Sequence, residues 1–339
     1  MRKITDSIRW GIVATGWVAA KFAEACVFES KLTGKSRLVA VASRDAQKAA
    51  EFAKTWGIPR AYGSYEALFA DPDIDAVYIA TPHNSHVSLS IAAIKAGKAV
   101  LCEKPVSLTS DEFRPVIETA RKLDLFFMEA MWMKFNPSFK KALEWIAEGR
   151  IGHPSFIRAD FFIKSVFNPA SRYFDPALGG GALLDVGIYP VTCAVMMAGN
   201  KMPDSITSII RKGSTGVDLY NKAHLTWKTD KGTSTVADLS SAIDLGELEE
   251  TRSAIILGDK GSIILPFFWM PQEVRFVDSS NQNETIFHSP FECNGYEHEI
   301  REVESCLFAG KSESSVQTWA DSIMVMDILD KIRMEAKDE

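Results

Sequence analysis

The chain has 339 residues, of which 46% are hydrophobic and 24% are charged, and its formal net charge is −6. This length predicts two domains, and the composition is typical of a globular protein that buries a sizeable core. The acidic balance, without any long run of lysine or arginine, argues against a nucleic-acid partner and against binding to an anionic membrane surface.

The cysteines and the N-terminal stretch bear on the cellular compartment. The cysteines are scattered and form no C-x-x-C pair: Cys26, Cys102, Cys193, Cys293 and Cys306. Such spacing predicts reduced thiols rather than a disulfide framework. Residues 1–10 lack the apolar core of a secretory signal, and the longest apolar runs are of strand length. We therefore expect a cytoplasmic protein without a membrane-spanning segment.

The first part of the chain alternates between short apolar runs and helical patterns. The apolar runs cover 8–14, 37–43, 75–81, 98–104 and 125–131. The helical patterns cover 18–28, 46–56, 65–69, 85–96 and 110–123. Wholly apolar strands separated by helices predict a parallel sheet that is covered on both faces. We assign 1–131 to a doubly wound, Rossmann-type domain that binds NAD(P).

The pattern changes after Pro137. Helices are expected at 138–149, 182–197, 297–308 and 318–334, a strand at 155–167, and successive strands joined by turns over 205–287. Alternating apolar and polar residues in these strands suit a sheet with one solvated face. We assign 132–339 to an α+β domain with a largely antiparallel open sheet, for substrate binding and oligomerisation.

The turn after the first apolar run nearly matches a dinucleotide-binding fingerprint. In G-x-G-x-x-G/A, the second glycine lets the backbone approach the pyrophosphate and the third position lets the helix pack on the strand. Gly16 and Ala19 fill these two positions, whereas Ala14 replaces the first glycine. The alternative is a plain strand-to-helix connection. Because the turn follows the first strand and opens a helix, we expect the cofactor to bind at Ala14, Thr15, Gly16, Trp17 and Val18.

The end of the second strand bears on the choice between NADP and NAD. An acidic residue there binds the ribose 2′-hydroxyl, whereas arginine accommodates a 2′-phosphate. This chain has Ser43 and Arg44, both able to donate to phosphate, so we expect NADP, with NAD possible. Arg44 could instead be a solvated surface residue, and Asp45 could be a displaced acid, although its position suits a helix cap.

The next two strand ends carry further polar residues. The third strand ends at Thr81 and Pro82 and leads to His83, Asn84 and His86, which should line the cofactor crevice. Helix capping is the structural alternative for this loop.

Glu103, Lys104 and Pro105 end the fourth strand. A charged pair at the end of a buried strand is either a structural ion pair or a functional group beside a pocket.

The second domain contains a carboxylate and a phenol on one predicted helix. Asp185 and Tyr189 are separated by four residues, which places both on one helical face, and three glycines at 179–181 precede them. An N-terminal charge and an interface aromatic are the structural alternative. The six histidines show no metal-ligand spacing, so we expect no metal.

Aromatic residues near the expected mouth of the site are candidates for the substrate pocket. They are Trp132, Phe156, Phe162, Phe167 and Trp269. Such residues are more often part of a core than of a pocket. Trp132, Phe156, Phe162 and Trp269 are the substrate-binding residues that we predict.

Five stretches in order resemble the Gfo/Idh/MocA oxidoreductases, the relatives of glucose-fructose oxidoreductase and inositol dehydrogenase. They are ATGWVA (14–19), TPHNSH (81–86), CEKP (102–105), MEAMWMKFNP (128–137) and GGGALLDVGIYP (179–190). The resemblance extends to NGYEHEIREVESCLFAG (294–310) and is greatest to the dihydrodiol dehydrogenase and NADP-dependent D-xylose dehydrogenase type, which has Tyr at the second catalytic position.

The resemblance implies roles for the candidate residues. Lys104 would polarise the substrate oxygen, Tyr189 would act as general acid or base, and Asp185 would orient the substrate hydroxyl or the lysine. Glu103 and Lys104 would also contact the cofactor.

The expected activity is hydride transfer between NADP and a carbinol or carbonyl carbon of a sugar, polyol or trans-dihydrodiol. The alternatives are an NAD-dependent inositol or deoxysugar dehydrogenase, or a non-catalytic NAD(P)-binding regulator. The expected assembly is a homodimer or a higher homo-oligomer.

Overall fold

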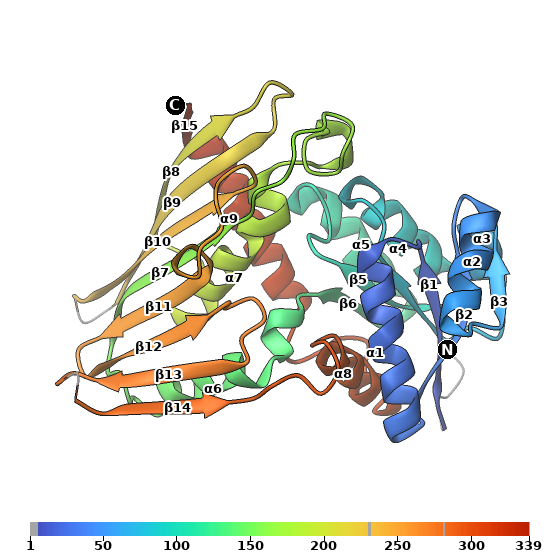
Figure 1. The fold of residues 1–339 in the computed structure, drawn as a ribbon, viewed down its shortest axis with the longest axis horizontal. Coiled ribbons are helices and arrows are strands. Elements are labelled where there is room, and N and C mark those ends of the chain that lie inside the picture. The colour runs from blue at the N-terminus through green and yellow to red at the C-terminus, as the bar shows by residue number, and fades with distance from the viewer. Residues whose placement is uncertain (1–5, 230–231, 281, 339) are drawn as a thin grey trace. The chain divides into compact units, whose positions relative to one another are not determined.

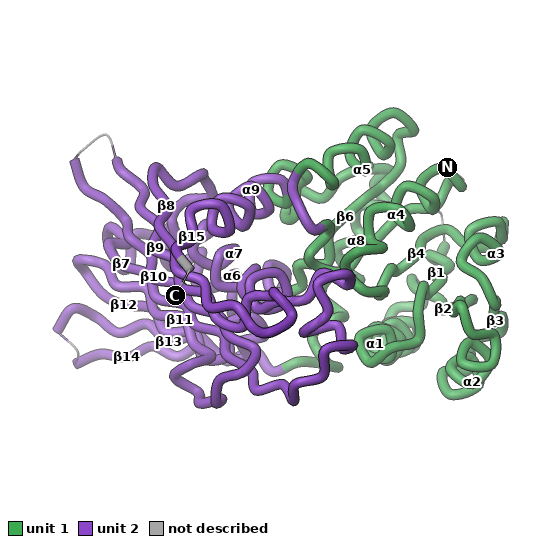
Figure 2. The backbone as a smooth tube through the Cα atoms, turned by 90° about the horizontal axis from the view of Figure 1, so that it is seen from above, with its two compact units in different colours: residues 1–107, 111–132, 291–322 green, residues 108–110, 133–290, 323–339 purple. Residues whose placement is uncertain are grey.

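The computed structural model describes residues 6–229, 232–280 and 282–338, which pack as two compact units (Figure 2). Unit 1 contains Met1–Ser107, Asp111–Trp132 and Phe291–Ser322, and unit 2 contains Leu108–Ser110, Met133–Pro290 and Ile323–Glu339. Segments far apart in sequence therefore share each unit. The boundary between residues 131 and 132 stays a prediction about domain organisation.

Unit 1 is built on a parallel sheet with the strand order β3-β2-β1-β4-β5-β6. Its strands are β1 (Ile8–Val13), β2 (Ser36–Ala42), β3 (Arg60–Tyr62), β4 (Ala76–Ile79), β5 (Ala99–Glu103) and β6 (Phe127–Ala130). This order is that of a doubly wound nucleotide-binding sheet, in which the strand order reverses between β1 and β4. The predicted fold class is confirmed for this unit. The three-residue strand β3 is too short to give a periodic signal in the sequence.

Helices accompany this sheet (Figure 1). They are α1 (Trp17–Thr33), α2 (Ala46–Trp56), α3 (Tyr65–Ala70), α4 (His86–Lys95), α5 (Ser110–Leu123) and α8 (Glu297–Phe308), with the 3-10 turn η1 (His83–Ser85). A second 3-10 turn, η2 (Trp132–Phe135), begins in unit 1 at Trp132 and continues into unit 2. The local sequence explains the ends of α2. The Asp45 carboxylate accepts hydrogen bonds from the amides of Gln47 and Lys48, and Gly57 ends the helix at φ 66°.

Unit 2 contains a nine-stranded sheet in the order β14-β13-β12-β11-β7-β10-β9-β8-β15. Its strands are β7 (Pro154–Phe162), β8 (Ser205–Lys212), β9 (Asp218–Lys228), β10 (Ser234–Ala242), β11 (Ser253–Gly258), β12 (Gly261–Pro266), β13 (Glu273–Asp278), β14 (Glu284–His288) and β15 (Ala336–Asp338). Two strand pairs, β7 with β10 and β8 with β15, are parallel and the others are antiparallel. The largely antiparallel sheet is thus confirmed, although β7 ends at Phe162 rather than at residue 167.

The helices of unit 2 are α6 (Pro137–Ala147), α7 (Ile188–Met197) and most of α9 (Trp319–Glu335), whose residues up to Ser322 belong to unit 1. The short helices are η3 (Pro176–Leu178), η4 (Leu183–Gly187) and η5 (Glu250–Arg252). The predicted helix over 182–197 is not uniform. Its first turn, η4, is π-helical, and the α-helix α7 begins only at Ile188. Single π-helical turns occur often at functional sites.

One helical segment in the described part of the chain, Pro176–Met197, is long and apolar enough to cross a bilayer, with a mean hydropathy of 1.5. The expectation that apolar runs are only of strand length is therefore wrong for this segment. Of its most apolar stretch, 89% is buried inside the structure, and α7 packs against β7, β10 and β11 (Figure 1). The apolar composition serves the core of unit 2.

Candidate active site

The turn between β1 and α1 has the geometry of an anion-binding loop. Gly16 is the N-cap of α1 in an extended conformation, and a Cβ added there would meet nothing within 4 Å. No side chain caps α1, and its first turn carries no acidic residue. The first amides of the helix are thus available to an anion such as a pyrophosphate.

The other residues of this turn flank that opening. Ala14 adopts φ 100°, in the left-handed region where glycine is usual, so the first position of the fingerprint keeps a glycine-like backbone. Trp17 is 72% exposed at the start of α1, and Thr15 and Val18 are half-buried.

At the end of β2, the three polar residues have different roles. Asp45 caps α2, and its amide donates to the Ser43 hydroxyl at 3.2 Å. Ser43 is buried, whereas the Arg44 side chain is exposed. The displaced acid is therefore engaged in helix capping, and the arginine is the group at this strand end that is open to a ligand.

The loop after β4 is tied to the segment after β5 by His86. Its Nδ1 lies 2.8 Å from the carbonyl oxygen of Pro105, and its Nε2 lies 2.8 Å from that of Thr81. Burial lowers the pKa of His86, although the two carbonyl acceptors oppose this shift. His83 is buried with its ring centroid 5.8 Å from that of His86, Pro82 precedes η1, and Asn84 is exposed.

At the end of β5, Glu103 accepts a hydrogen bond from the Tyr78 hydroxyl and another from the Lys104 amide at 3.2 Å. The peptide bond between Lys104 and Pro105 is cis. The predicted cofactor residues of unit 1 therefore lie at the carboxyl ends of β1, β2, β4 and β5, which meet at one edge of a parallel sheet.

In unit 2, Asp185 lies in η4 and is almost fully buried. Arg172 Nη1 donates to its Oδ1 at 2.7 Å, and Arg172 Nη2 donates to the Tyr173 hydroxyl at 2.8 Å. Burial lowers the pKa of Arg172, but Asp185 and Tyr173 outweigh burial and raise it above the usual value. Arg172 lies in an irregular loop, and no sequence pattern marked it as a site residue.

Tyr189, at the start of α7, packs against aromatic side chains. Its ring centroid lies 5.7 Å from that of Phe161, which stacks on Trp269 at 3.8 Å. Phe156 and Phe162 have the opposite parity on β7, so they project from the other face of the sheet, where Phe162 lies 6.2 Å from Tyr220. Trp269 thus belongs to the aromatic stack that meets Tyr189 through Phe161, whereas Phe156 and Phe162 do not. The β7 aromatic beside Tyr189 is Phe161, which no sequence pattern marked.

Two further aromatic residues have other neighbours. Trp132 belongs to unit 1, where its ring centroid is 4.9 Å from Tyr296 and 6.5 Å from Phe291. Phe167 is 55% exposed, and its ring centroid lies 5.1 Å from that of Phe174. A phenylalanine so exposed on a loop is not a core residue.

Two family descriptions match the chain. Residues 8–131 match the GFO/IDH/MocA oxidoreductase family with an NAD-binding Rossmann fold, and residues 139–264 match the GFO/IDH/MocA C-terminal domain.

Full-length relatives and solved structures agree with these matches. The chain is 34% identical over 333 residues to trans-1,2-dihydrobenzene-1,2-diol dehydrogenase of Homo sapiens (96% of each chain), and 36% identical over 329 residues to that of Xenopus laevis (95% of this chain, 96% of the relative).

Among solved structures, a 3-ketoreductase from Actinomadura kijaniata with NADP and TDP-benzene has a TM-score of 0.84 at 24% identity (98% and 99% covered). An aldose-aldose oxidoreductase from Caulobacter crescentus with glycerol has a TM-score of 0.84 at 20% identity, with 97% of each chain covered. These two likenesses show the fold.

Proposed function

Because the chain belongs to the GFO/IDH/MocA oxidoreductase family, we propose that it is an NADP-dependent oxidoreductase acting on a trans-dihydrodiol, sugar or polyol. The observation that carries this proposal is that unit 2 buries a carboxylate, Asp185, and a phenol, Tyr189, on consecutive helical segments, with the phenol beside an aromatic stack. Such a pair can orient a hydroxyl and exchange its proton.

Cofactor binding is assigned to unit 1. The amides at the start of α1 and the open space above Gly16 fit a pyrophosphate, and the exposed Arg44 guanidinium fits a ribose 2′-phosphate. His86 holds the loop after β4, so that Thr81 to Asn84 form a fixed wall of this site.

The catalytic roles follow from the chemistry of the side chains. The bound nicotinamide supplies a hydride acceptor or donor at a carbon of its ring. In the oxidative direction, Tyr189 Oη accepts the proton of the substrate hydroxyl as the carbinol carbon becomes a carbonyl carbon. The positive charge of the Lys104 ammonium polarises the reacting oxygen and favours the ionised form of the Tyr189 phenol. Asp185, held by Arg172, accepts a hydrogen bond from a substrate hydroxyl.

The substrate class rests on the aromatic stack. Flat rings such as those of Phe161 and Trp269 suit either the unsaturated ring of a dihydrodiol or the apolar face of a sugar. The named relatives, which are 34–36% identical over nearly their whole length, favour the dihydrodiol.

The assembly that we propose is a cytoplasmic homodimer formed through the open face of the sheet. Leu257, Phe156 and Val236 are register partners on β11, β7 and β10, so their side chains form a row across that face. Leu257 is 40% exposed, and Phe162 and Tyr220 lie on the same face. Light scattering of the purified protein should give twice the monomer mass, and a monomer would refute the dimer.

The experiment that tests the activity is a screen by NADPH absorbance. Trans-1,2-dihydrobenzene-1,2-diol, D-xylose, D-glucose and myo-inositol are each supplied with NADP+ and with NAD+. We expect turnover of the dihydrodiol with NADP+. Cofactor binding without turnover of any substrate would indicate a regulator, and a preference for NAD+ would reject the role given to Arg44.

A further inference from the structure

Three polar side chains of the sheet lie directly behind the π-helical turn η4. Asp218 and Asn221 stand on β9, and Ser241 stands on β10, where it is the register partner of Asn221. Asn221 and Ser241 are buried. Both strands pack against η4. We call these three residues the backing network.

The backing network holds the start of η4 through Asp218. The Leu183 amide donates to Asp218 Oδ2 at 2.6 Å. Gly181, at φ 118°, passes so close that an added Cβ would lie 2.1 Å from Asp218 Oδ1. Only glycine fits this position, so the carboxylate fixes the path of the chain into η4.

The end of η4 is held through Ser241. Asn221 Nδ2 donates both to Asp218 Oδ2 at 3.1 Å and to Ser241 Oγ at 2.6 Å. A Cβ added to Gly187 would lie 2.7 Å from Ser241 Oγ, so this hydroxyl is packed against the backbone at the last residue of η4. The network therefore contacts the turn on both sides of Asp185.

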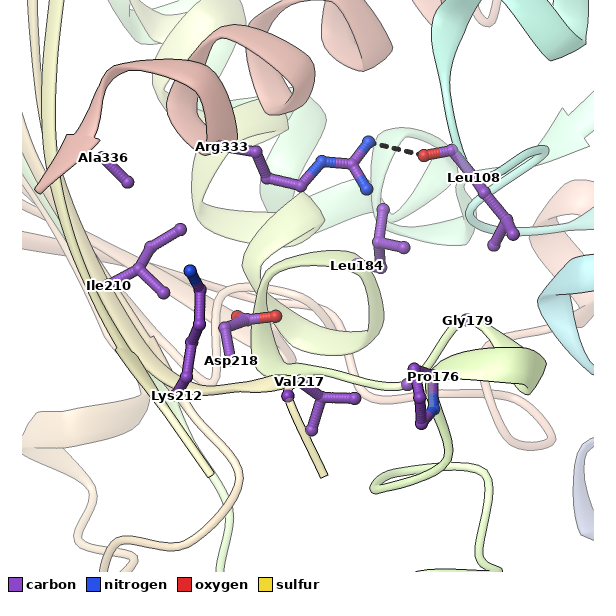
Figure 3. Close-up of a pocket in the computed structure, with 12 residues that line it drawn as sticks. Leu108, Pro176, Gly179, Leu184, Ile210, Lys212, Val217, Asp218, Arg333 and Ala336 are labelled. Carbon is purple, nitrogen blue, oxygen red and sulfur yellow. Dashed lines mark hydrogen bonds between the residues drawn. The ribbon is translucent and has the colours of Figure 1, made fainter. Parts of the chain in front are cut away.

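A cavity of about 340 Å³ within unit 2 lies beside this contact (Figure 3). Asp218 lines it together with Pro176, Gly179 and Gly180 of the segment that leads into η4. The segment folds on itself through backbone hydrogen bonds such as Gly180 to Asp175 (3.0 Å) and Gly181 to Tyr173 (2.9 Å). Asp218 supplies the hydrogen bond that ties the start of η4 to the sheet beside this incompletely packed space.

We propose that Asp218 is a positioning residue. Together with Asn221 and Ser241, it fixes the π-helical turn and thereby orients the Asp185 carboxylate toward the substrate. This inference rests on the proposed function, in which Asp185 binds a substrate hydroxyl. The carboxylate of Asp218 touches neither substrate nor cofactor in this role.

The test compares Asp218→Ala with Asp218→Asn and with the control Asp204→Ala, using the best substrate of the screen at about pH 8. Burial raises the pKa of Asp218 to about 6, so the carboxylate is ionised there. Asp204 Oδ2 also accepts a backbone amide at 2.6 Å, from Lys228, but its partner lies on β9 far along the strand from η4.

We expect Asp218→Ala to lower kcat by roughly ten- to a hundredfold with NADP+ affinity unchanged, because small displacements of a positioned group cost that much. Asp218→Asn keeps an oxygen for the Leu183 amide and should recover most of the rate. Asp204→Ala should leave kcat unchanged. Equal losses of kcat in Asp218→Ala and Asp204→Ala would overturn the inference.

A double-mutant cycle separates positioning from general destabilisation. In an Asp185→Asn background, Asp218→Ala should lower kcat further by less than about threefold, because both changes act through one carboxylate. A full additional loss would overturn the inference while leaving the proposed function intact. If Asp185→Asn alone leaves kcat unchanged, the proposed role of Asp185 is wrong and the inference with it.

A second variant keeps the test decisive if Asp218→Ala does not fold. Asn221→Ala removes the bridge between Asp218 and Ser241 and leaves the bond from the Leu183 amide in place. It should lower kcat by roughly three- to tenfold, with less than about a threefold further loss in the Asp185→Asn background. An unchanged kcat in a folded Asn221→Ala protein would overturn the inference for the network.

Discussion

Arg172 and Asp185 form an ion pair, with 2.7 Å between Arg172 Nη1 and Asp185 Oδ1. The two partners are unequally buried, since the arginine side chain is 46% exposed and the aspartate side chain only 6%. The arginine therefore neutralises a charge that water hardly reaches. Replacing it leaves the carboxylate buried without this partner, whereas replacing the carboxylate leaves an arginine that water can solvate.

We expect Arg172→Met to lower the free energy of unfolding by about 1 to 2 kcal/mol and to lower kcat/KM at least about tenfold, because Asp185 loses its orientation. Urea denaturation and steady-state kinetics measure the two effects. Arg158→Met is the control, since it removes a partly buried pair with Asp160 on β7 (3.3 Å) and should leave kcat/KM unchanged. Full activity of Arg172→Met would show that the pair is only structural.

Tyr189→Phe removes the phenolic oxygen and keeps the ring that packs on Phe161. Because the proposed proton transfer needs that oxygen, kcat should fall by roughly a hundredfold or more. NADP affinity, measured by isothermal titration, should be retained. Tyr220→Phe, on the other face of the sheet, should keep normal kcat. Unchanged turnover of Tyr189→Phe would reject the assigned role.

Arg44→Ala tests the cofactor preference. The exposed guanidinium is expected to bind the 2′-phosphate, so the affinity for NADP should fall roughly ten- to a hundredfold while the affinity for NAD stays the same. The control variant is Arg37→Ala. Arg37 is exposed near the start of β2, at the opposite end of that strand from Arg44, so the affinities for NADP and NAD should both stay unchanged. Equal losses for both cofactors in Arg44→Ala would remove the basis for the preference.

Ala14→Gly tests the first position of the cofactor turn. Ala14 adopts φ 100°, which costs an L-residue about 1 to 2 kcal/mol, and glycine recovers this strain while losing about 0.5 to 1 kcal/mol through the entropy of the unfolded chain. A net gain of about 0.5 to 1 kcal/mol is expected in urea denaturation, with NADP affinity changed less than about twofold. Ala20→Gly, inside α1, should instead cost about 1 kcal/mol. A large gain in NADP affinity would mean that alanine impairs this turn.

Glu299 on α8 makes stability depend on pH. Its side chain is fully buried, and neither carboxylate oxygen has a hydrogen-bond partner among the described residues. Burial, and then the charge of Glu103, raise the pKa of Glu299 well above its ordinary value of 4.5. The folded protein thus keeps a proton that the unfolded chain releases, so stability falls as the pH rises above that value.

Glu299→Gln cannot ionise, so its free energy of unfolding should exceed that of the parent by a margin that grows from about pH 5 to about pH 8. Urea denaturation at several pH values measures this margin. Glu297→Gln, on the same helix, weakens three backbone hydrogen bonds to a carboxylate and should destabilise the protein. A margin for Glu299→Gln that does not change with pH would contradict the raised pKa.

The sequence allowed the fold class to be predicted because its local signals are strong. Helix α2 begins at residue 46 and ends at residue 56, as predicted, because Asp45 caps its start and Gly57 ends it. The apolar runs that form β1, β4 and β5 are buried as expected for strands covered on both faces.

Parts of the candidate site could not be predicted because their signals are not local. Phe161 and Phe162 are neighbours of the same type, and only the register of β7 decides which of them meets Tyr189. Arg172 reaches Asp185 from an irregular loop without periodicity. The π-helical turn needs the backing network of distant strands, which no window of sequence around Asp185 contains.

The return of residues 291–322 to unit 1 has a consequence for biosynthesis. Helix α8 covers α1 in unit 1. The Ser36 hydroxyl donates a hydrogen bond to Glu304 of α8 (2.6 Å), and Arg301 of α8 pairs with the buried Glu29 of α1 (2.7 Å). During synthesis, Glu304 and Arg301 are added to the chain only after all strands from β7 to β14 have been made. Although domains usually fold in the order of synthesis, the N-terminal unit here is completed late, so a chain terminated before Phe291 leaves it with an unsealed face that chaperones and proteases recognise.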